Sequence, residues 1–191
     1  MMKIGVLALQ GAFREHCWML EGCGVTAVEI RRSEELDKVN GLIIPGGEST
    51  AIGKLMVQWG LMDTIKSKVK QGMAVFGTCA GMILLAENII ESDQPRLGLM
   101  DIVVVRNAFG RQRESFERDI TVSELGAESL KAIFIRAPYI ERAGRNVEIM
   151  ARVEEKIVFA RQNNILVTAF HPELTIDKRV HKYFIEMSRK A

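Results

Sequence analysis

A cysteine that could serve as a nucleophile, Cys79, lies at the centre of the pentapeptide 77–81 (GTCAG). The apolar run 73–76 precedes this pentapeptide, and the helix-compatible residues 82–86 follow it. A buried strand, a tight turn and a helix with the spacing Gly-x-Cys-x-Gly predict a nucleophile elbow, where glycine is needed because the two backbones crowd the corner. Unpaired N–H groups and the dipole at a helix N-terminus favour a thiolate there. The pentapeptide alone is equally compatible with a buried, unreactive cysteine.

A histidine and a glutamate suited to activate that cysteine follow the apolar run 165–170 as His171-Pro172-Glu173. A cysteine nucleophile needs a base within hydrogen-bond reach and usually a third group to orient the base. Residues i and i+2 of an extended segment point to the same side, and Pro172 favours extension of the residue before it. We therefore expect Glu173 to reach one ring nitrogen of His171 while the other faces Cys79.

A glycine pair stands at the end of another predicted strand, in residues 45–50 (PGGEST). Adjacent glycines before a helix free backbone N–H groups to bind an anion. The amides of Gly47 and Ala80 could together hold the oxyanion of a tetrahedral intermediate. Two other interpretations stay open for this segment alone. It could be a helix-entry turn with Ser49 as N-cap, or a phosphate site, although it lacks the Gly-Lys-Ser/Thr ending of a P-loop.

The elements that must position these residues alternate between strand and helix over the first half of the chain. Strands are expected at residues 3–9, 25–30, 41–44 and 73–76, helices at 12–22, 50–59 and 62–70, and a capped turn at 33–36. This alternation predicts an α/β fold with a parallel sheet covered on both faces. Ligands of such sheets bind beyond the carboxyl ends of the strands, so Gln10-Gly11, the glycine pair and the elbow should converge there.

The pattern changes after about residue 97. Short β-like runs are found at residues 102–105, 120–122, 133–135, 147–153, 157–160 and 165–170. They predict an antiparallel or mixed extension of the sheet. Residues 107–118 form a polar connection, either a solvated loop or a loop on the substrate or partner side. Residues 176–189 predict a closing amphipathic helix, with Ile176, Val180, Phe184 and Met187 on its apolar face.

Two histidines lie outside this pattern of strand ends. His16 falls in the first predicted helix, one residue from an apolar stripe formed by Phe13, Cys17 and Leu20. We expect it to be partly exposed. His181 falls in the closing helix, where a solvated or structural role suffices.

Composition narrows the class of protein. The 191 residues suit one domain, 1–191, and 48% apolar with 26% charged residues is ordinary for a soluble protein. The net charge is +2 with both signs interspersed, which argues against nucleic acid as a partner. Three cysteines without a C-x-x-C pair suggest neither a zinc site nor a disulfide framework, and favour the cytoplasm. No stretch approaches the ~20 apolar residues of a membrane span.

Taken together, these motifs resemble the class I (triad) glutamine amidotransferases, and among them the glutaminase subunits of pyridoxal 5'-phosphate synthase. The blocks that carry the resemblance are residues 7–11 (LALQG), 45–50 (PGGEST), 77–81 (GTCAG), 106–112 (RNAFGRQ), 115–117 (SFE), 134–138 (FIRAP) and 170–174 (FHPEL). The elbow and HPE are shared by all triad glutaminases, whereas LALQG, RNAFGRQ and FIRAP are typical of this branch. The resemblance implies a three-layer αβα sandwich, flavodoxin-like, with a mostly parallel central sheet and an added antiparallel portion.

The resemblance also implies the chemistry. L-glutamine would be hydrolysed to L-glutamate and ammonia, with Cys79 forming a γ-glutamyl thioester. His171 would carry the proton from the thiol to the departing ammonia, and Glu173 would orient the imidazole. The glutamine-binding positions of the family fall on Gly47, Glu48, Ser49, Arg106, Ile135 and Arg136. Arginine suits the α-carboxylate, which a guanidinium grips with two hydrogen bonds. Neither a cofactor nor a metal ion is implied.

A partner protein is implied as well. It is the synthase subunit, a (β/α)8 barrel that joins the ammonia to a pentose phosphate and a triose phosphate to build pyridoxal 5'-phosphate, in an assembly of up to 12 + 12 subunits. The glutaminases that this chain resembles show little activity until they bind the synthase subunit. Gln10 and the loop 45–49 are therefore expected at that interface, where docking would complete the oxyanion hole.

Three other functions compete with this interpretation. The chain could be a glutaminase for another acceptor, such as imidazole glycerol phosphate synthesis, although LALQG and FIRAP disfavour it. It could be a flavodoxin-like binding module with a redox-sensing or inert cysteine, which would not need the HPE segment. It could also be a cysteine peptidase on the same elbow, with an open cleft in place of a pocket for one amino acid.

Overall fold

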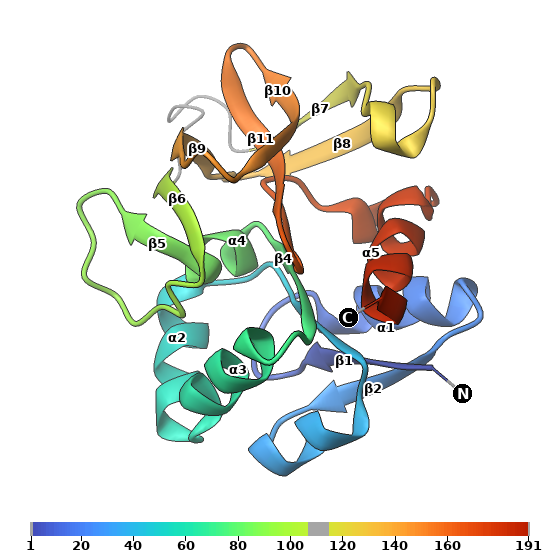
Figure 1. The fold of residues 1–191 in the computed structure, drawn as a ribbon. Helices are drawn as coiled ribbons and strands as arrows, with labels where there is room; N and C mark the ends of the chain where they lie inside the picture. The colour runs from blue at the N-terminus through green and yellow to red at the C-terminus, as the bar shows by residue number, and fades with distance from the viewer. Residues whose placement is uncertain (1, 107–114, 191) are drawn as a thin grey trace.

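A wide, curled sheet forms the centre of the molecule (Figure 1). The computed structural model describes residues 2–106 and 115–190. The strands are β1 (Lys3–Leu7), β2 (Thr26–Ile30), β3 (Gly41–Ile44), β4 (Ala74–Thr78), β5 (Ala86–Ile89), β6 (Met100–Val105), β7 (Ser115–Ile120), β8 (Leu130–Ile135), β9 (Tyr139–Ala143), β10 (Glu148–Val153), β11 (Lys156–Gln162) and β12 (Ile165–Thr168). The α-helices are α1 (Phe13–Gly22), α2 (Ser49–Gln58), α3 (Leu61–Lys70), α4 (Ala80–Leu85) and α5 (Arg179–Lys190), and the 3-10 helices are η1 (Ser33–Lys38), η2 (Ser123–Leu125) and η3 (Pro172–Leu174).

The sheet has a parallel half and a largely antiparallel half. Strands β2, β1, β3, β4 and β12 are neighbours in that order and run parallel. Beyond β12, the strands β11, β9 and β6 pair antiparallel, β5 runs parallel to β6, and β10 pairs with β11. Strands β7 and β8 form a separate antiparallel pair. These pairings confirm the predicted fold class, a parallel α/β sheet with an antiparallel addition.

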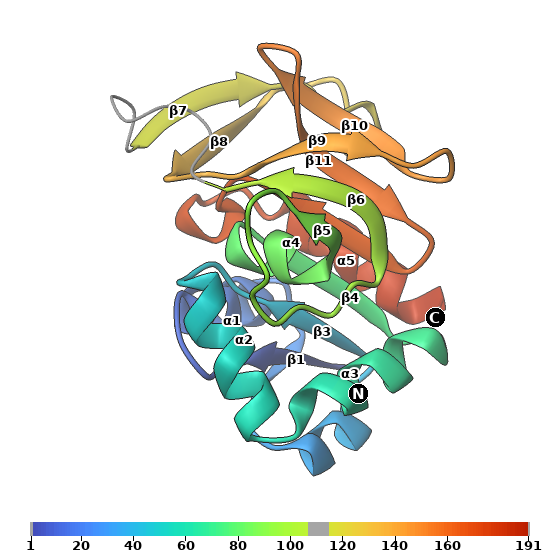
Figure 2. The ribbon, with the colours of Figure 1, turned by 90° about the vertical axis from the view of Figure 1, so that its left-hand side faces the viewer.

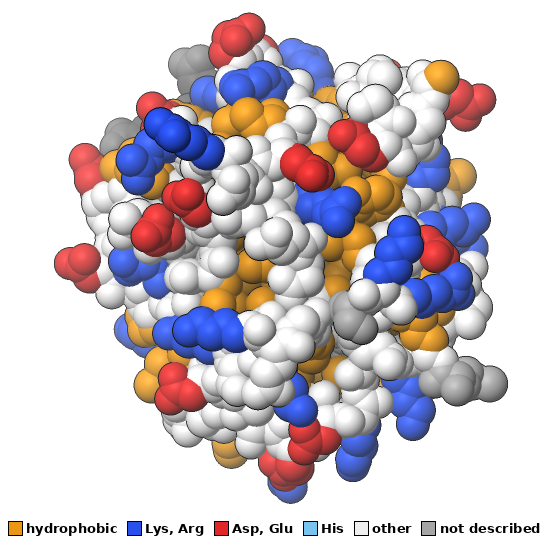
Figure 3. All heavy atoms as spheres, viewed as in Figure 1, with side chains coloured by type: hydrophobic (Ala, Val, Ile, Leu, Met, Phe, Trp, Pro, Cys, Tyr) orange, Lys and Arg blue, Asp and Glu red, His pale blue; other side chains and the backbone are white. Residues whose placement is uncertain are grey.

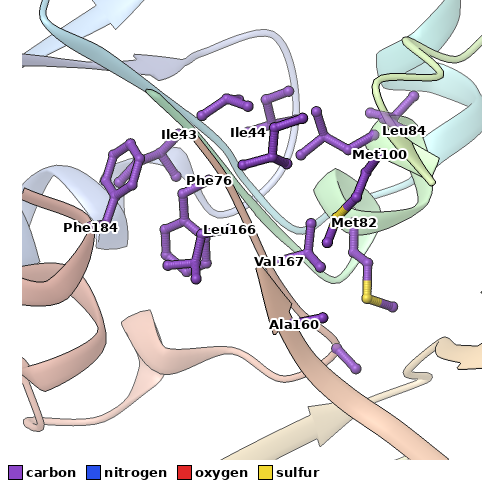
Figure 4. Close-up of a cluster of buried hydrophobic side chains, with 14 of the residues drawn as sticks. Ile43, Ile44, Phe76, Met82, Leu84, Met100, Ala160, Leu166, Val167 and Phe184 are labelled. Atoms are coloured by element: carbon purple, nitrogen blue, oxygen red, sulfur yellow. The ribbon is translucent and has the colours of Figure 1, made fainter. Parts of the chain in front are cut away.

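Helices cover both faces of the parallel half, as expected for an αβα arrangement. In Figure 1, α1 and α5 lie on one side of these strands, and α2, α3 and α4 lie on the other. Both β3 and β4 are buried at every position, which is the pattern of parallel strands covered on two faces. Phe76 on β4 packs against Phe184 on α5, with ring centroids 5.6 Å apart. Figure 4 shows this pair on one side of the strands and Met82 and Leu84 on the other.

Aromatic rings fix the small sheet β7–β8 to the main sheet. Phe116 on β7 stacks on Phe134 on β8 at a centroid distance of 4.6 Å, and Phe134 packs edge-on against Phe170 at 5.8 Å. The backbone N–H of His171 donates a hydrogen bond to the carbonyl of Ile133, at 2.8 Å. Figure 2 shows the pair β7–β8 above the helical layers, beside β9 and β10. The end of β8 is thereby held next to the segment that carries His171.

The closing helix differs from its prediction at its first turn. Helix α5 begins at Arg179, and Ile176 is 97% exposed, so the predicted place of Ile176 on the apolar face is wrong. Asp177 accepts a hydrogen bond from the Arg179 N–H at 3.0 Å and pairs with its guanidinium. A carboxylate placed there satisfies a free N–H of the helix start, and the helix therefore begins after residue 177. Val180 and Phe184 are buried as predicted.

The predicted boundaries in the antiparallel half are less accurate. Residues 115–118 belong to β7 and not to the polar connection expected over 107–118; residues 107–114, which include most of the RNAFGRQ block, lie outside the described residues. The strand expected at 120–122 ends at Ile120, because Val122 begins the turn of η2. Strands β5 and β9 were not predicted, since neither is a continuous apolar run.

The surface carries mixed charge. On the face drawn in Figure 3, Lys and Arg side chains are interspersed with Asp and Glu. Within the described part of the chain, no helix has the length and apolar character needed to cross a bilayer.

The junction of β4 and α4 is as crowded as the elbow motif predicts. A Cβ added at Gly77 would lie 2.5 Å from the carbonyl carbon of Gly81, and one added at Gly81 would overlap the carbonyl oxygen of Ile44 on β3. Neither neighbour is a side chain that can rotate away. The close contact between strand and helix therefore requires both glycines.

Replacing Gly81 with alanine is expected to lower the free energy of unfolding by about 3 kcal/mol or more, the upper end for overpacking, because backbone must move. Gly60→Ala is the matched control. Gly60 has a φ of +67° but open space around it, so alanine there meets only the left-handed conformation, at a cost of about 1 kcal/mol. Urea unfolding measures both values, and equal losses would contradict crowding at the elbow.

Candidate active site

Cys79 occupies the turn between β4 and α4, which confirms the predicted strand–turn–helix arrangement. Its φ is +49°, an uncommon value for a residue with a side chain, and its backbone N–H donates to the carbonyl of Thr168 at 2.8 Å. Such conformations persist only where the surroundings impose them, and they gather at functional sites. The residue is buried, with 8% of its surface exposed, and its Sγ lies 4.0 Å from the carbonyl oxygen of Ile135.

His171 and Glu173 form a close pair beside that sulfur. His171 Nδ1 and Glu173 Oε1 are 2.7 Å apart, and the Glu173 side chain is completely buried. The contact was predicted, but the extended backbone was not found, because Pro172–Leu174 is the 3-10 turn η3. Proline is well suited to the first position of such a turn, which brings the carboxylate back to the imidazole.

The electrostatics of the pair keep it charged. Burial lowers the pKa of His171, but hydrogen bonds to Cys79 and Glu173 outweigh burial and raise the pKa to about 10. Burial likewise raises the pKa of Glu173, yet His16 and His171 beside it bring the pKa below its ordinary value. A protonated imidazole next to Cys79 is therefore stable, and it is held by an ionised carboxylate.

A cavity of about 360 Å³ opens over these groups, a size suited to a small molecule. The structure brings eight of the predicted site residues into its lining: Gly47, Glu48, Ser49, Cys79, Arg106, Ile135, Arg136 and His171. Glu173 and Ala80 lie behind the lining, 5% and 1% exposed. Across the described ranges, no group of three or more His, Cys, Asp or Glu side chains is placed to hold a metal ion.

The glycine loop is held from three sides. The Gly46 N–H donates to Thr78 Oγ1 and its carbonyl accepts from the Ala12 N–H, both at 3.0 Å. The Glu48 N–H donates to Gln10 Oε1 at 2.8 Å. A Cβ on Gly46 would collide with the His171 ring, so glycine lets the loop lie against the imidazole. The use of the Gly47 and Ala80 amides as oxyanion donors stays a prediction.

The start of α2 corrects one alternative for this loop. Glu48, and not Ser49, is the N-cap, and its carboxylate accepts hydrogen bonds from the N–H groups of Thr50 and Ala51 at 3.0 and 2.7 Å. Although partial burial raises the pKa of Glu48, these bonds lower it to a net value below the ordinary one. Ser49 is the first helical residue and is buried.

A residue that the sequence did not indicate, Gln94, organises the neighbouring wall. Its Oε1 accepts hydrogen bonds from Arg106 at 2.8 Å and from the hydroxyl of Ser49 at 3.1 Å. Arg106 also lies 3.6 Å from a Glu48 oxygen. The guanidinium is thus fixed at the edge of the cavity. Arg136, the second cavity arginine, has a φ of +42°, a further strained position in this site.

Both remaining histidines are buried beside the triad, which corrects the expectation that His16 is partly exposed. His16 and His181 are each 0% exposed. The buried positions of α1 are His16, Met19 and Leu20, whereas Cys17 is half-buried, so the buried face is rotated by one residue from the predicted stripe. His16 Nε2 lies 3.4 Å from Glu173 Oε2.

Known proteins are similar to this chain in sequence and in fold. The chain is 58% identical to a pyridoxal 5'-phosphate synthase subunit PdxT of Carboxydothermus hydrogenoformans, over 97% of each chain. It is 59% identical to the protein of that name from Moorella thermoacetica, over 97% of this chain and 99% of that one. A crystal structure of a glutamine amidotransferase superposes with a TM-score of 0.94 at 50% identity, covering 97% and 98% of the two chains. PurLQS from Thermotoga maritima, at 17% identity and a TM-score of 0.73, shares the fold.

Fold and geometry together define a class: α/β proteins whose cysteine elbow faces a histidine–glutamate pair at the carboxyl ends of parallel strands. The model of the SNO glutamine amidotransferase family matches residues 6–190. The chain belongs to the SNO glutamine amidotransferase family.

The buried histidines predict a dependence of stability on pH. Burial lowers the pKa of His181 from 6.5 to about 3. The unfolded chain therefore binds a proton near pH 6.5 that the folded chain refuses until about pH 3, so stability is lost as the pH falls through this window, by about 1.4 kcal/mol per unit for one proton. His181→Gln keeps a donor but does not titrate. Its free energy of unfolding in urea should fall less steeply between pH 6.5 and 4, and identical slopes would contradict the assignment.

Proposed function

We propose that this chain hydrolyses L-glutamine to L-glutamate and ammonia through a thioester on Cys79. The observation that carries the proposal is the placement of Cys79 and the His171–Glu173 pair at one cavity, in a member of this amidotransferase family. We treat residues 1–191 as one glutaminase domain. One continuous buried core, which draws on both halves of the sheet, supports this treatment.

The geometry supports a two-stage reaction. In the first stage Cys79 Sγ attacks the side-chain amide carbon of glutamine, and His171 holds the thiol proton and passes it to the departing ammonia. A γ-glutamyl thioester remains on the sulfur. In the second stage His171 takes a proton from water, the hydroxide oxygen attacks the thioester, and the thiol is restored as glutamate leaves. Glu173 orients the imidazole and stabilises its protonated form throughout.

The oxyanion of each tetrahedral intermediate would lie against the Gly47 and Ala80 amides. Removing one donor of such a hole typically costs about 10²–10³ in kcat. The hydrogen bonds from Gly46 to Thr78 and from Glu48 to Gln10 fix the loop in this region.

Substrate binding follows from the other side chains of the lining. We assign the α-carboxylate of glutamine to Arg106 and Arg136, because a guanidinium matches a carboxylate with two hydrogen bonds. Glu48 supplies a negative charge near the cavity for the α-ammonium group, while Gly47, Ser49 and Ile135 contribute backbone and surface. A cavity of about 360 Å³ fits one amino acid better than a peptide, which disfavours a peptidase.

The partner we propose is the (β/α)8-barrel subunit of pyridoxal 5'-phosphate synthase, which would receive the ammonia in an assembly of up to 12 + 12 subunits in the cytoplasm. Relatives at 58–59% identity are named as subunits of that synthase. Gln10, Gly47 and Glu48 line the cavity and are exposed, so a docked partner would reach this part of the loop 45–49. The alternative is delivery of ammonia to another acceptor, such as imidazole glycerol phosphate synthase.

Replacing Cys79 with serine is expected to reduce ammonia release from glutamine by about 10³-fold or more, because the nucleophile of the triad is lost. The assay is run while purified synthase subunit is titrated in, and wild-type activity should rise with the synthase concentration until saturation. Cys23→Ser is the matched control, since Cys23 lies outside the cavity and should keep full activity. Persistent activity of Cys79→Ser would refute the nucleophile, and wild-type activity that is maximal without synthase would refute the partner's role.

Replacing Arg106 with lysine is expected to raise KM for glutamine by about 10-fold or more with a smaller change in kcat, because lysine keeps the charge but loses the two-pronged contact. Arg145→Lys, an exposed arginine outside the cavity, should leave KM unchanged. Steady-state kinetics of both variants decide the point. An unchanged KM in Arg106→Lys would remove this arginine from the binding of the α-carboxylate.

A further inference from the structure

A chain of buried polar groups continues from the triad into the core, away from the cavity. Glu173 Oε1 faces His171, and its other oxygen, Oε2, lies 3.4 Å from His16 Nε2. The second ring nitrogen of His16, Nδ1, lies 2.9 Å from His181 Nε2 on α5. His16 Nε2 is also 3.1 Å from Thr78 Oγ1, next to the nucleophile. Every histidine of the sequence is therefore connected to one carboxylate.

The network determines which nitrogen of His16 carries the proton. A lone pair on Nε2 would face the negative Glu173 oxygen, and His181 would then need its proton on Nδ1, which is buried without a partner. An unpaired buried donor costs about 1–3 kcal/mol. With the proton of His16 on Nε2, His181 donates from Nε2 to His16 Nδ1. The Nε2–H of His16 then lies between Thr78 Oγ1 at 3.1 Å and Glu173 Oε2 at 3.4 Å. Glu173 Oε2 is buried without a hydrogen-bond partner, so in this tautomer it faces a donor and not a lone pair. We assign this tautomer from the network.

His16 acts in this arrangement as a neutral donor. Burial lowers its pKa, and this outweighs the opposite effect of Glu173. The titratable groups that face it are Glu15 on its own helix, His171 and Glu173 after β12, and His181 on α5. A neutral N–H can fix a carboxylate oxygen without removing the charge that Glu173 needs for His171.

We propose that His16 is a positioning residue of the glutaminase reaction: its Nε2–H sets the rotation of the Glu173 carboxylate and thereby the orientation of His171, and His181 fixes the tautomer that makes this possible. The proposal rests on the proposed function. The His16 ring also connects to the loop 45–49. His16 Nε2 lies 3.1 Å from Thr78 Oγ1, and this oxygen accepts a hydrogen bond from the Gly46 N–H at 3.0 Å. A change at His16 should therefore act on the rate of the chemical step and not on the binding of glutamine.

Two substitutions of nearly equal shape distinguish the loss of the His16 N–H donor from a change in side-chain volume. His16→Gln retains an N–H that can face Glu173, whereas His16→Met fills the space without a donor. Leu20→Ala, a buried position of the same helix, controls for lost stability alone. Each variant is assayed with the synthase subunit for kcat and KM against pH, and thermal unfolding reports its folding.

A second readout needs neither glutamine nor the synthase. The rate at which iodoacetamide alkylates Cys79, followed on the peptide that contains it, reports how His171 supports the sulfur. If wild-type protein released no ammonia from glutamine, the proposed function would fail, yet the alkylation profile would still test His16.

His16→Met should lower kcat at least about tenfold with KM within about twofold of wild type. In His16→Met, two pH values should rise by about half a unit or more: the acid-side midpoint of the kcat/KM profile, and the pH at which the alkylation rate is half its maximum. The reason is that the Glu173 carboxylate loses a donor and binds protons more readily. His16→Gln should recover most of kcat and the wild-type profile, and Leu20→Ala should lower the melting temperature without shifting the profile. The proposal is overturned if the Met and Gln variants behave alike, or if the profile of His16→Met moves no further than that of Leu20→Ala.

Discussion

The carboxylate of Glu173 is a charge inside the core, since none of its side chain is exposed. A buried charge is tolerated where donors surround it, and removing one partner of such a group typically costs about 3–5 kcal/mol. His171 lies at one oxygen of Glu173 and His16 at the other, at 2.7 and 3.4 Å. One of these histidines follows β12 and the other is on α1. The packing of α1 against the sheet and the geometry of the catalytic base are therefore a single constraint.

The two halves of the sheet contribute different walls of the cavity. The parallel half supplies the elbow and the loop 45–49, both held by backbone contacts at strand ends. The antiparallel half supplies Arg106 after β6, and the separate pair β7–β8 supplies Ile135 and Arg136 at the end of β8. The reacting groups thus stand on crowded backbone, whereas the two arginines assigned to the α-carboxylate of glutamine follow the later strands β6 and β8. The main-chain bond between His171 and Ile133 joins the two walls directly.

The sequence predicts what depends on neighbours along the chain. The elbow at Cys79 follows from glycine spacing after an apolar run, and the parallel sheet covered on both faces follows from the βαβ alternation. The burial of His16 could not be predicted, because residues 17–20 are all apolar and helical periodicity does not decide which of them faces the core; Trp18 is in fact 65% exposed. Gln94 meets Ser49 across 45 positions in a contact that no local pattern encodes. A predicted boundary was wrong where a side chain sets the start of an element, as Asp177 does before α5.

The buried histidine pair is costly for what it contributes to packing. Apolar side chains of similar volume would fill the space between α1 and α5 without desolvating three ring nitrogens and leaving a fourth, His181 Nδ1, without a partner. Stability alone therefore does not account for His16 and His181, whereas a requirement to hold the Glu173 oxygen does. Among the described residues, α5 contributes none to the lining of the cavity. The orientation of the base nevertheless depends on this last helix, because the tautomer of His16 is set by His181.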